Sequence, residues 1–299
     1  MESFKRRPVF KVESQSSPAD VLLRPIGESL VLIAPERVES VREVLEGLTV
    51  VVRDGEYPVC RIDVESKTIE LSMPSIEQTW CTAFAHFTFY TKVLAGKRIT
   101  TPTTVDLTVD PDLRAAMRLL SWCFDRRGPW PPDLPRPLAQ PPEASDLHVA
   151  NEVAVCAAAF QLHHELAHYR LGHRFSEETA ISIDQERDAD YEAAEWVLGR
   201  CPPETFNKRA FGIAASLITL VGEAIRQRNL GGRTHPRAVE RLVNTLDRHV
   251  QRPDHMVWGF TMGVLKLHLD NARIAVPELV YETPRDAIEA YVDVLSQLQ

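Results

Sequence analysis

The sequence contains few cysteines and no pattern that would pair them. None of the five stands in a Cys-x-x-Cys pair, and they are dispersed along the chain, as Cys60, Cys81, Cys123, Cys156 and Cys201. An odd and scattered set excludes the disulfide framework of a small secreted domain. We therefore expect reduced thiols.

Long apolar segments are also missing. The longest apolar run, near residues 210–222, is shorter than the roughly 20 residues that a membrane span needs. The N-terminal residues MESFKRRPVFKVESQ include basic side chains but no apolar segment behind them, so they do not resemble a signal peptide. These absences predict a soluble, cytoplasmic protein without a membrane span.

Positive charge is scarce as well. The formal net charge is −8 and no long basic run occurs, so a direct contact with nucleic acid is not expected. The composition, 44% hydrophobic and 25% charged, is typical of a globular protein of 299 residues with one large domain or two small ones.

The first 73 residues predict a small antiparallel sheet with one helix. Apolar runs of strand length occur twice, and two later segments alternate apolar and polar side chains around the turn Ser66-Lys67. The alternation predicts a hairpin with one solvated face. Strands are predicted at residues 30–34, 48–52, 60–65 and 69–73, and a helix at residues 36–46.

A core helix is predicted after Pro74. Ser75 and Gln78 fit a capping box, and Gly96 fits a helix stop. Apolar side chains recur between them on one helical face, and His86 within this helix is expected to be structural.

A proline-rich segment separates this part from the rest of the chain. Residues 128–142 contain seven prolines in fifteen positions, which excludes a helix or a central strand. We therefore divide the chain into an N-terminal part with sheet and helices (1–127), a connector (128–143) and a helical region (144–299), forming one integrated catalytic unit. The later helices are predicted at residues 146–173, 184–199, 204–228, 236–250, 255–271 and 284–297.

The segment QLHHELAH, residues 161–168, is the first candidate for chemistry. Its HExxH pattern places His164 and His168 one helical turn apart on one face, where both imidazoles can reach one zinc ion. Glu165 lies beside them and can accept a proton from an attacking water. The pattern alone is weak, but the apolar residues around it predict a buried helix, in which uncompensated polar groups are costly. His163 is rotated off this face and is given no ligand role.

A catalytic zinc needs a third protein ligand. His173 is one candidate, although its offset does not match the HExxHxxGxxH pattern. The other is Glu186, which shares a helical face with Asp190 and follows His168 after room for a turn and a returning helix. Glu186 would then bind the metal and Asp190 would orient a ligand histidine. A solvated acidic face is the alternative, and Asp188 is expected to be exposed.

The segment GGRTHPRAVERL, residues 231–242, contains a further histidine. Pro236 suits the first position of a helix. His235 before it is either only the start of that helix or a residue that stabilises the oxyanion of a tetrahedral intermediate. The residues alone leave both possibilities open.

Taken together, these segments resemble the Lit-type phage-exclusion peptidases. The resemblance rests on HHELAH, ERDADYEAAEWVLG, KRAFGIAASLITL and THPRAVERL in this order, with SIEQTWCTAFAHFTFYTKVL upstream, and covers about residues 70–245. The HExxH, ExxAD and THP pieces also resemble the wider gluzincins. Membrane-bound members of that group have spans that this chain lacks.

The resemblance implies a mostly helical α+β fold with a gluzincin core. It also implies a zinc endopeptidase of abortive defence against phage, which cleaves the host translation elongation factor Tu once a phage-derived trigger appears. Carried over residue by residue, it makes Glu165 the general base, Asp190 a support for a ligand and His235 a contact of the substrate or transition state. The zinc ligands would be His164, His168 and Glu186.

Two other functions remain open. The chain could be a zinc protease that cleaves a repressor or antitoxin, or a binding module with a structural zinc and no enzymatic activity. Structural zinc sites usually have four protein ligands, so a fourth ligand such as His173 would favour the binding module. For a peptidase we expect the N-terminal sheet to pack on the active-site helix and offer an edge strand to an extended substrate.

Overall fold

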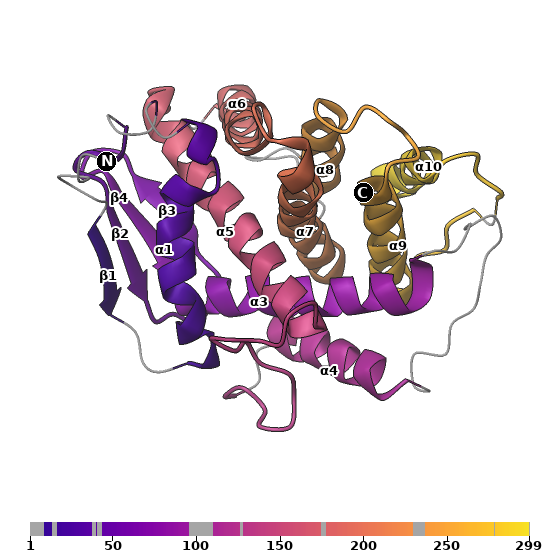
Figure 1. The fold of residues 1–299 in the computed structure, drawn as a ribbon. Helices are drawn as coiled ribbons and strands as arrows, with labels where there is room; N and C mark the ends of the chain where they lie inside the picture. The colour runs from indigo at the N-terminus through magenta and orange to yellow at the C-terminus, as the bar shows by residue number, and fades with distance from the viewer. Residues whose placement is uncertain are drawn as a thin grey trace.

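Figure 1 shows a mostly helical molecule with a small sheet at one side. The structure is a computed structural model that describes residues 9–13, 17–37, 40, 44–95, 110–125, 128–174, 178–229, 237–277 and 279–298. Within these residues no helix combines the length and the apolar character that crossing a membrane requires. The predicted α+β class with a predominance of helix is confirmed.

The sheet is mixed, so the predicted antiparallel sheet is wrong for two of its three strand pairings. Strand β1 pairs parallel with β2, β2 pairs parallel with β4, and only the predicted hairpin of β3 and β4 is antiparallel. The chain passes from β2 to the sheet edge as β3 and returns as β4 beside β2, which makes β2 and β4 parallel. The strands, in the order β1-β2-β4-β3, are Val9–Glu13, Thr49–Arg53, Thr68–Ser72 and Cys60–Asp63.

The strand predicted at residues 30–34 is wrong, because most of this segment belongs to helix α1, Leu23–Leu32. Ile26 and Leu30, one helical turn apart, are both buried, whereas Leu32 is 61% exposed. The apolar residues of the run therefore do not share one face of a strand. Two short 3-10 helices flank α1, at Pro18–Leu22 and Pro35–Arg37. The helix predicted at 36–46 falls partly outside the described residues.

Helix α3, Met73–Phe89, is the predicted core helix but begins earlier than its predicted cap. The side chain of Ser72 accepts a hydrogen bond from the amide of Ser75, so Ser72 is the N-cap and the capping box assigned to Ser75 and Gln78 is wrong. A π-helical turn, Tyr90–Leu94, continues the helix, and Gly96 lies outside the described residues. Helix α4, Pro111–Asp125, was not predicted.

The proline-rich connector has neither helix nor strand in its described residues, and helices follow it as predicted. Helix α5 contacts α1, α3, α6, α7 and β3, which makes it the centre of the molecule (Figure 1). One apolar core includes residues from both sides of the connector, among them Trp80 of α3 and Leu162 of α5. The later helices are α5 Asp146–Arg170, α6 Thr179–Leu198, α7 Pro203–Gln227, α8 Ala238–Asp247, α9 Met256–Asn271 and α10 Pro284–Gln297.

Candidate active site

Helix α5 carries the HExxH pattern through the interior of the protein. Its first turn is capped by Ser145, whose side chain accepts a hydrogen bond from the amide of His148. Small residues then let the helix lie close to α7, since a Cβ atom added at Gly212 would stand 2.3 Å from Cβ of Cys156. This packing fixes the position of the C-terminal half of α5, where His164 and Glu165 lie.

The structure brings the three predicted metal ligands together. Nε2 of His164 lies 3.2 Å from Nε2 of His168, and each nitrogen lies 3.5 Å from a different carboxylate oxygen of Glu186. In a tetrahedral zinc site with bonds of ~2.05 Å, neighbouring ligand atoms are separated by ~3.3 Å. The separations and the two-histidine, one-carboxylate donor set therefore fit zinc without rearrangement of the backbone.

Each ligand histidine is also held through its second ring nitrogen. Nδ1 of His164 lies 3.0 Å from Oδ1 of Asp190, the arrangement predicted for this aspartate. Nδ1 of His168 lies 3.0 Å from Nδ1 of His173. His173 thus contacts the side of the His168 ring that faces away from Glu186, and within the described residues it does not join the group of three. Partners of this kind fix the tautomer and the orientation of a metal-binding imidazole.

Arg241 of α8 is a largely buried cation behind the site, and the sequence predicted no role for it. Its Nε and Nη2 atoms donate to the two oxygens of Asp190 at 2.7 and 2.8 Å, and Nη1 lies 3.4 Å from Oε2 of Glu186. One guanidinium therefore connects a ligand with the residue that orients another ligand. A signal was present, because Arg241 lies in the last part of THPRAVERL, on the helix that follows His235.

Burial and these contacts set the charges of the acidic groups. Burial would raise the pKa of Glu186, but its contacts with His164 and the charge of Arg241 lower it to about 2. Burial also opposes ionisation of Asp190, and Arg241 and His164 overcome it and lower that pKa to about 2. Both carboxylates are consequently charged at neutral pH, as metal binding and support of a ligand require.

Glu165 sits in a different environment. Its carboxylate accepts a hydrogen bond of 2.9 Å from the backbone amide of Ile62, on strand β3. Burial raises the pKa of Glu165 to about 7, with a further upward contribution from Glu186. A pKa near the working pH is the property that a general base needs.

The other residues considered in the sequence do not belong to the group of three donor residues. His163 is buried away from the group of three, with its ring stacked on Trp196 at 5.3 Å between centroids. Asp188 is exposed, as expected. His86 is buried, and its Nε2 atom lies 3.0 Å from Nε2 of His268. These two histidines belong to helices α3 and α9, whereas the HExxH residues belong to α5. His235 lies outside the described residues, so its predicted role stays a prediction.

Comparisons with known proteins agree on one family. The family model described as peptidase U49 matches residues 69–261. The chain is 30% identical over 245 residues to a protein named cell death peptidase, from Escherichia coli (strain K12), covering 77% of this chain and 81% of that protein. No solved structure matches.

Proposed function

The chain belongs to the peptidase U49 family, and from this premise we propose that it is a zinc-dependent endopeptidase of the Lit-like class. A peptidase is what the family membership supports directly. The chemistry of the donor set supports the metal.

The observation that carries the proposal is the convergence of three donor atoms beside the partly buried carboxylate of Glu165. The ligand atoms of His164, His168 and Glu186 all lie within 4.8 Å of one another. Three protein ligands leave one position of a tetrahedral ion open, which is typical of catalytic sites. His173 contacts the outer nitrogen of His168 instead of joining the donor set, which argues against a closed structural site.

Zinc bound by these three residues would supply Lewis acidity, which polarises the scissile carbonyl and eases deprotonation of water. The other steps belong to the chain. Glu165, buried beside the ligands, would take the proton of the attacking water and deliver it to the leaving amine. Asp190 and His173 would keep the two imidazoles turned toward the metal. The substrate or transition-state role of His235 stays part of this proposal.

Strand β3 offers the substrate an edge. The amide of Ser72 donates to the carbonyl of Val59, so the alternate residues Cys60 and Ile62 direct their backbone groups away from β4. Ile62 is the residue whose amide contacts Glu165. An extended peptide that adds to this edge would therefore run past the base and the metal ligands.

For the target we propose the elongation factor Tu of the host cell, with cleavage in the cytoplasm after a phage-derived peptide appears. A protease against an abundant host protein has to be latent until it is needed. Composite recognition would provide latency, because the trigger adds contacts that hold the scissile segment in reacting geometry. The name of the Escherichia coli relative, cell death peptidase, is consistent with such a role.

The test is an incubation of the purified protein with casein, with elongation factor Tu, and with the factor plus lysate of infected cells, followed by identification of new N-termini. We expect cleavage of the factor only in the last mixture, and a rate about 10² to 10⁴ lower for Glu165→Gln. Rapid cleavage of casein would refute latency. Fragments of another protein, such as a repressor, would overturn the target but keep the chemistry, and undiminished cleavage by Glu165→Gln would refute the mechanism.

A further inference from the structure

A cavity lies between α4 and the C-terminal ends of α7 and α9. Its volume is about 760 Å³, within the range of roughly 300–1,000 Å³ typical of small-molecule sites. None of its residues belongs to the group of metal ligands or to the residues that support them. The lining consists of Arg114, Met117, Arg118, Leu120, Ser121, Phe124, Ile225, Arg226, Arg228, His268, Asn271 and Ala272.

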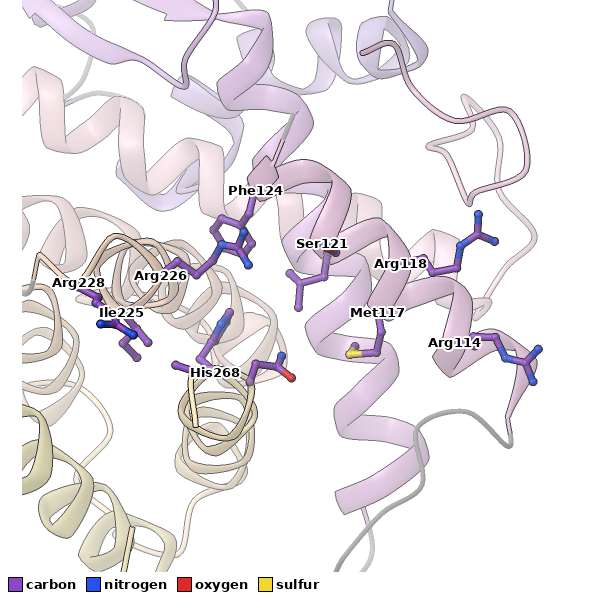
Figure 2. Close-up of a pocket in the computed structure, with 12 residues that line it drawn as sticks. Arg114, Met117, Arg118, Ser121, Phe124, Ile225, Arg226, Arg228 and His268 are labelled. Carbon is purple, nitrogen blue, oxygen red and sulfur yellow. The ribbon is translucent and has the colours of Figure 1, made fainter. Parts of the chain in front are cut away.

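The charge of this lining is opposite to that of the protein. The chain has a formal net charge of −8, yet four arginines and no carboxylate line the cavity among the residues that the structure describes. Two of the arginines belong to α4 and two to the end of α7. Figure 2 shows Arg226 beside His268 on one side and Ser121 and Met117 of α4 on the other, whereas the side chains of Arg114 and Arg118 extend from α4 in the direction away from His268. Such a local concentration of positive charge attracts anions.

Arg118 and Arg226 are available to a ligand because their present ion pairs are at least partly exposed to solvent. Nη2 of Arg118 lies 2.8 Å from Asp133, and both side chains are more than half exposed. Arg226 pairs with Asp125, and both side chains are about 40% exposed or less. Surface ion pairs of this kind contribute little to stability and can open at low cost.

Arg228 occupies a backbone position that would suit another residue better. It caps α7 in the left-handed conformation, with φ of 51°, where glycine or asparagine is common. A residue kept in a disfavoured conformation motivates the search for a function of its side chain. Here that side chain contributes positive charge to the cavity.

The floor of the cavity is rigid. His268 is only 4% exposed and contacts His86 of α3 at 3.0 Å between Nε2 atoms. Its ring lies so close to α7 that a Cβ atom at Gly222 would stand 2.5 Å from Cε1 of His268. A preformed floor of this kind lowers the entropic cost of binding.

The walls of the cavity provide surfaces on which a planar group could stack. Met117, Leu120 and Ile225 are apolar, and the guanidinium of Arg226 lies 5.2 Å from the ring centroid of Phe124. Arginine and aromatic side chains both stack on planar rings. The hydroxyl of Ser121 and the amide of Asn271 add hydrogen-bonding groups near these surfaces.

We propose that this cavity binds a nucleoside polyphosphate, with the phosphates held by Arg226 and Arg228 and the base against the apolar wall. Guanidinium groups bind phosphate oxygens through paired, charge-assisted hydrogen bonds. The lining comes from three helices around a concave space, which suits a small molecule better than an extended acidic peptide. This site goes beyond the peptidase function and does not depend on it.

The test is isothermal titration of the full-length protein with ATP and GTP, in excess Mg²⁺ so that the nucleotide does not remove bound metal. Inorganic triphosphate, adenosine and a hexaglutamate peptide serve as comparison probes. The test variant combines Arg226→Gln with Arg228→Asn, and the control combines Arg24→Gln with Arg252→Asn. Both pairs remove two positive charges, and the control residues lie in exposed ion pairs away from the cavity.

We expect saturable binding of ATP or GTP that weakens at least about tenfold in the test variant and less than about twofold in the control. Arg228→Asn alone should also weaken binding, and it should fold normally because asparagine tolerates the left-handed conformation. Absence of nucleotide binding, or equal binding by the test variant, would overturn the proposal. Tighter binding of hexaglutamate would overturn it in favour of a peptide, and equal binding of triphosphate would overturn the place assigned to the base.

Discussion

Replacing Arg241 by leucine should destabilise the protein far more than an ordinary surface substitution. The side chain is 12% exposed and donates two hydrogen bonds to Asp190, which is 1% exposed. Without the guanidinium, Asp190 either stays charged without its buried cation or takes up a proton and weakens its support of His164. Removal of one partner from a buried ion pair costs about 3–5 kcal/mol of unfolding free energy.

Urea denaturation of the chelator-treated protein at neutral pH measures this loss. The loss corresponds to a fall of roughly 5–8 °C in Tm. Arg248→Leu is the matched control, since Arg248 stacks over Tyr191 at 3.7 Å to the ring centroid and such an exposed contact contributes about 0.5–1 kcal/mol. Arg241→Lys should fall between them, because lysine keeps the charge but not the forked geometry. A loss for Arg241→Leu no larger than that for Arg248→Leu would refute the reasoning.

Two further predictions concern His173 and His268. His173→Ala should weaken zinc binding about 10- to 100-fold in a chelator competition, whereas the exposed neighbour Arg174→Ala should leave it unchanged; equal affinities would refute an orienting role for His173. Stability should fall as pH falls from about 6.5 to 4, because burial lowers the pKa of His268 to about 4 and only the unfolded chain binds the proton in that window. His268 contributes about 1.4 kcal/mol per pH unit to this slope, and urea titrations in which His268→Gln shows the same slope as wild type would contradict this source.

The sequence predicted the helices after the connector well, and the reason is periodicity. Each predicted helix after the connector has a counterpart, and the strand at 48–52 and the following hairpin are present. The apolar run at 30–34 failed because run length alone does not separate a buried strand from a buried helix. The spacing of Leu22, Ile26 and Leu30 was the better signal. Pairing direction depends on how distant strands are placed, which local alternation does not encode.

The candidate site was likewise predicted in part from the sequence. His164 and His168 lie one turn apart on a single helix, so the sequence sufficed to bring them together. Glu186 and Asp190 could be placed because only eight residues separate their helix from α5. Arg241 lies 51 residues beyond Asp190, and its contact depends on the packing of α8 against α6. The contact of His173 with the outer nitrogen of His168 depends on the turn after α5. The position of His173 in the sequence showed only that it does not match the third histidine of the HExxHxxGxxH pattern.

Elemental analysis of the purified protein tests the central claim most directly, because it needs neither substrate nor trigger. The account predicts one zinc per chain in the wild type and in Asp188→Ala, which changes an exposed acid on the same helix as Glu186. It predicts almost no zinc in the double variant His168→Ala with Glu186→Ala, whose side chains supply two of the three converging donor atoms. Full retention of zinc in that double variant would contradict the assignment of the metal site.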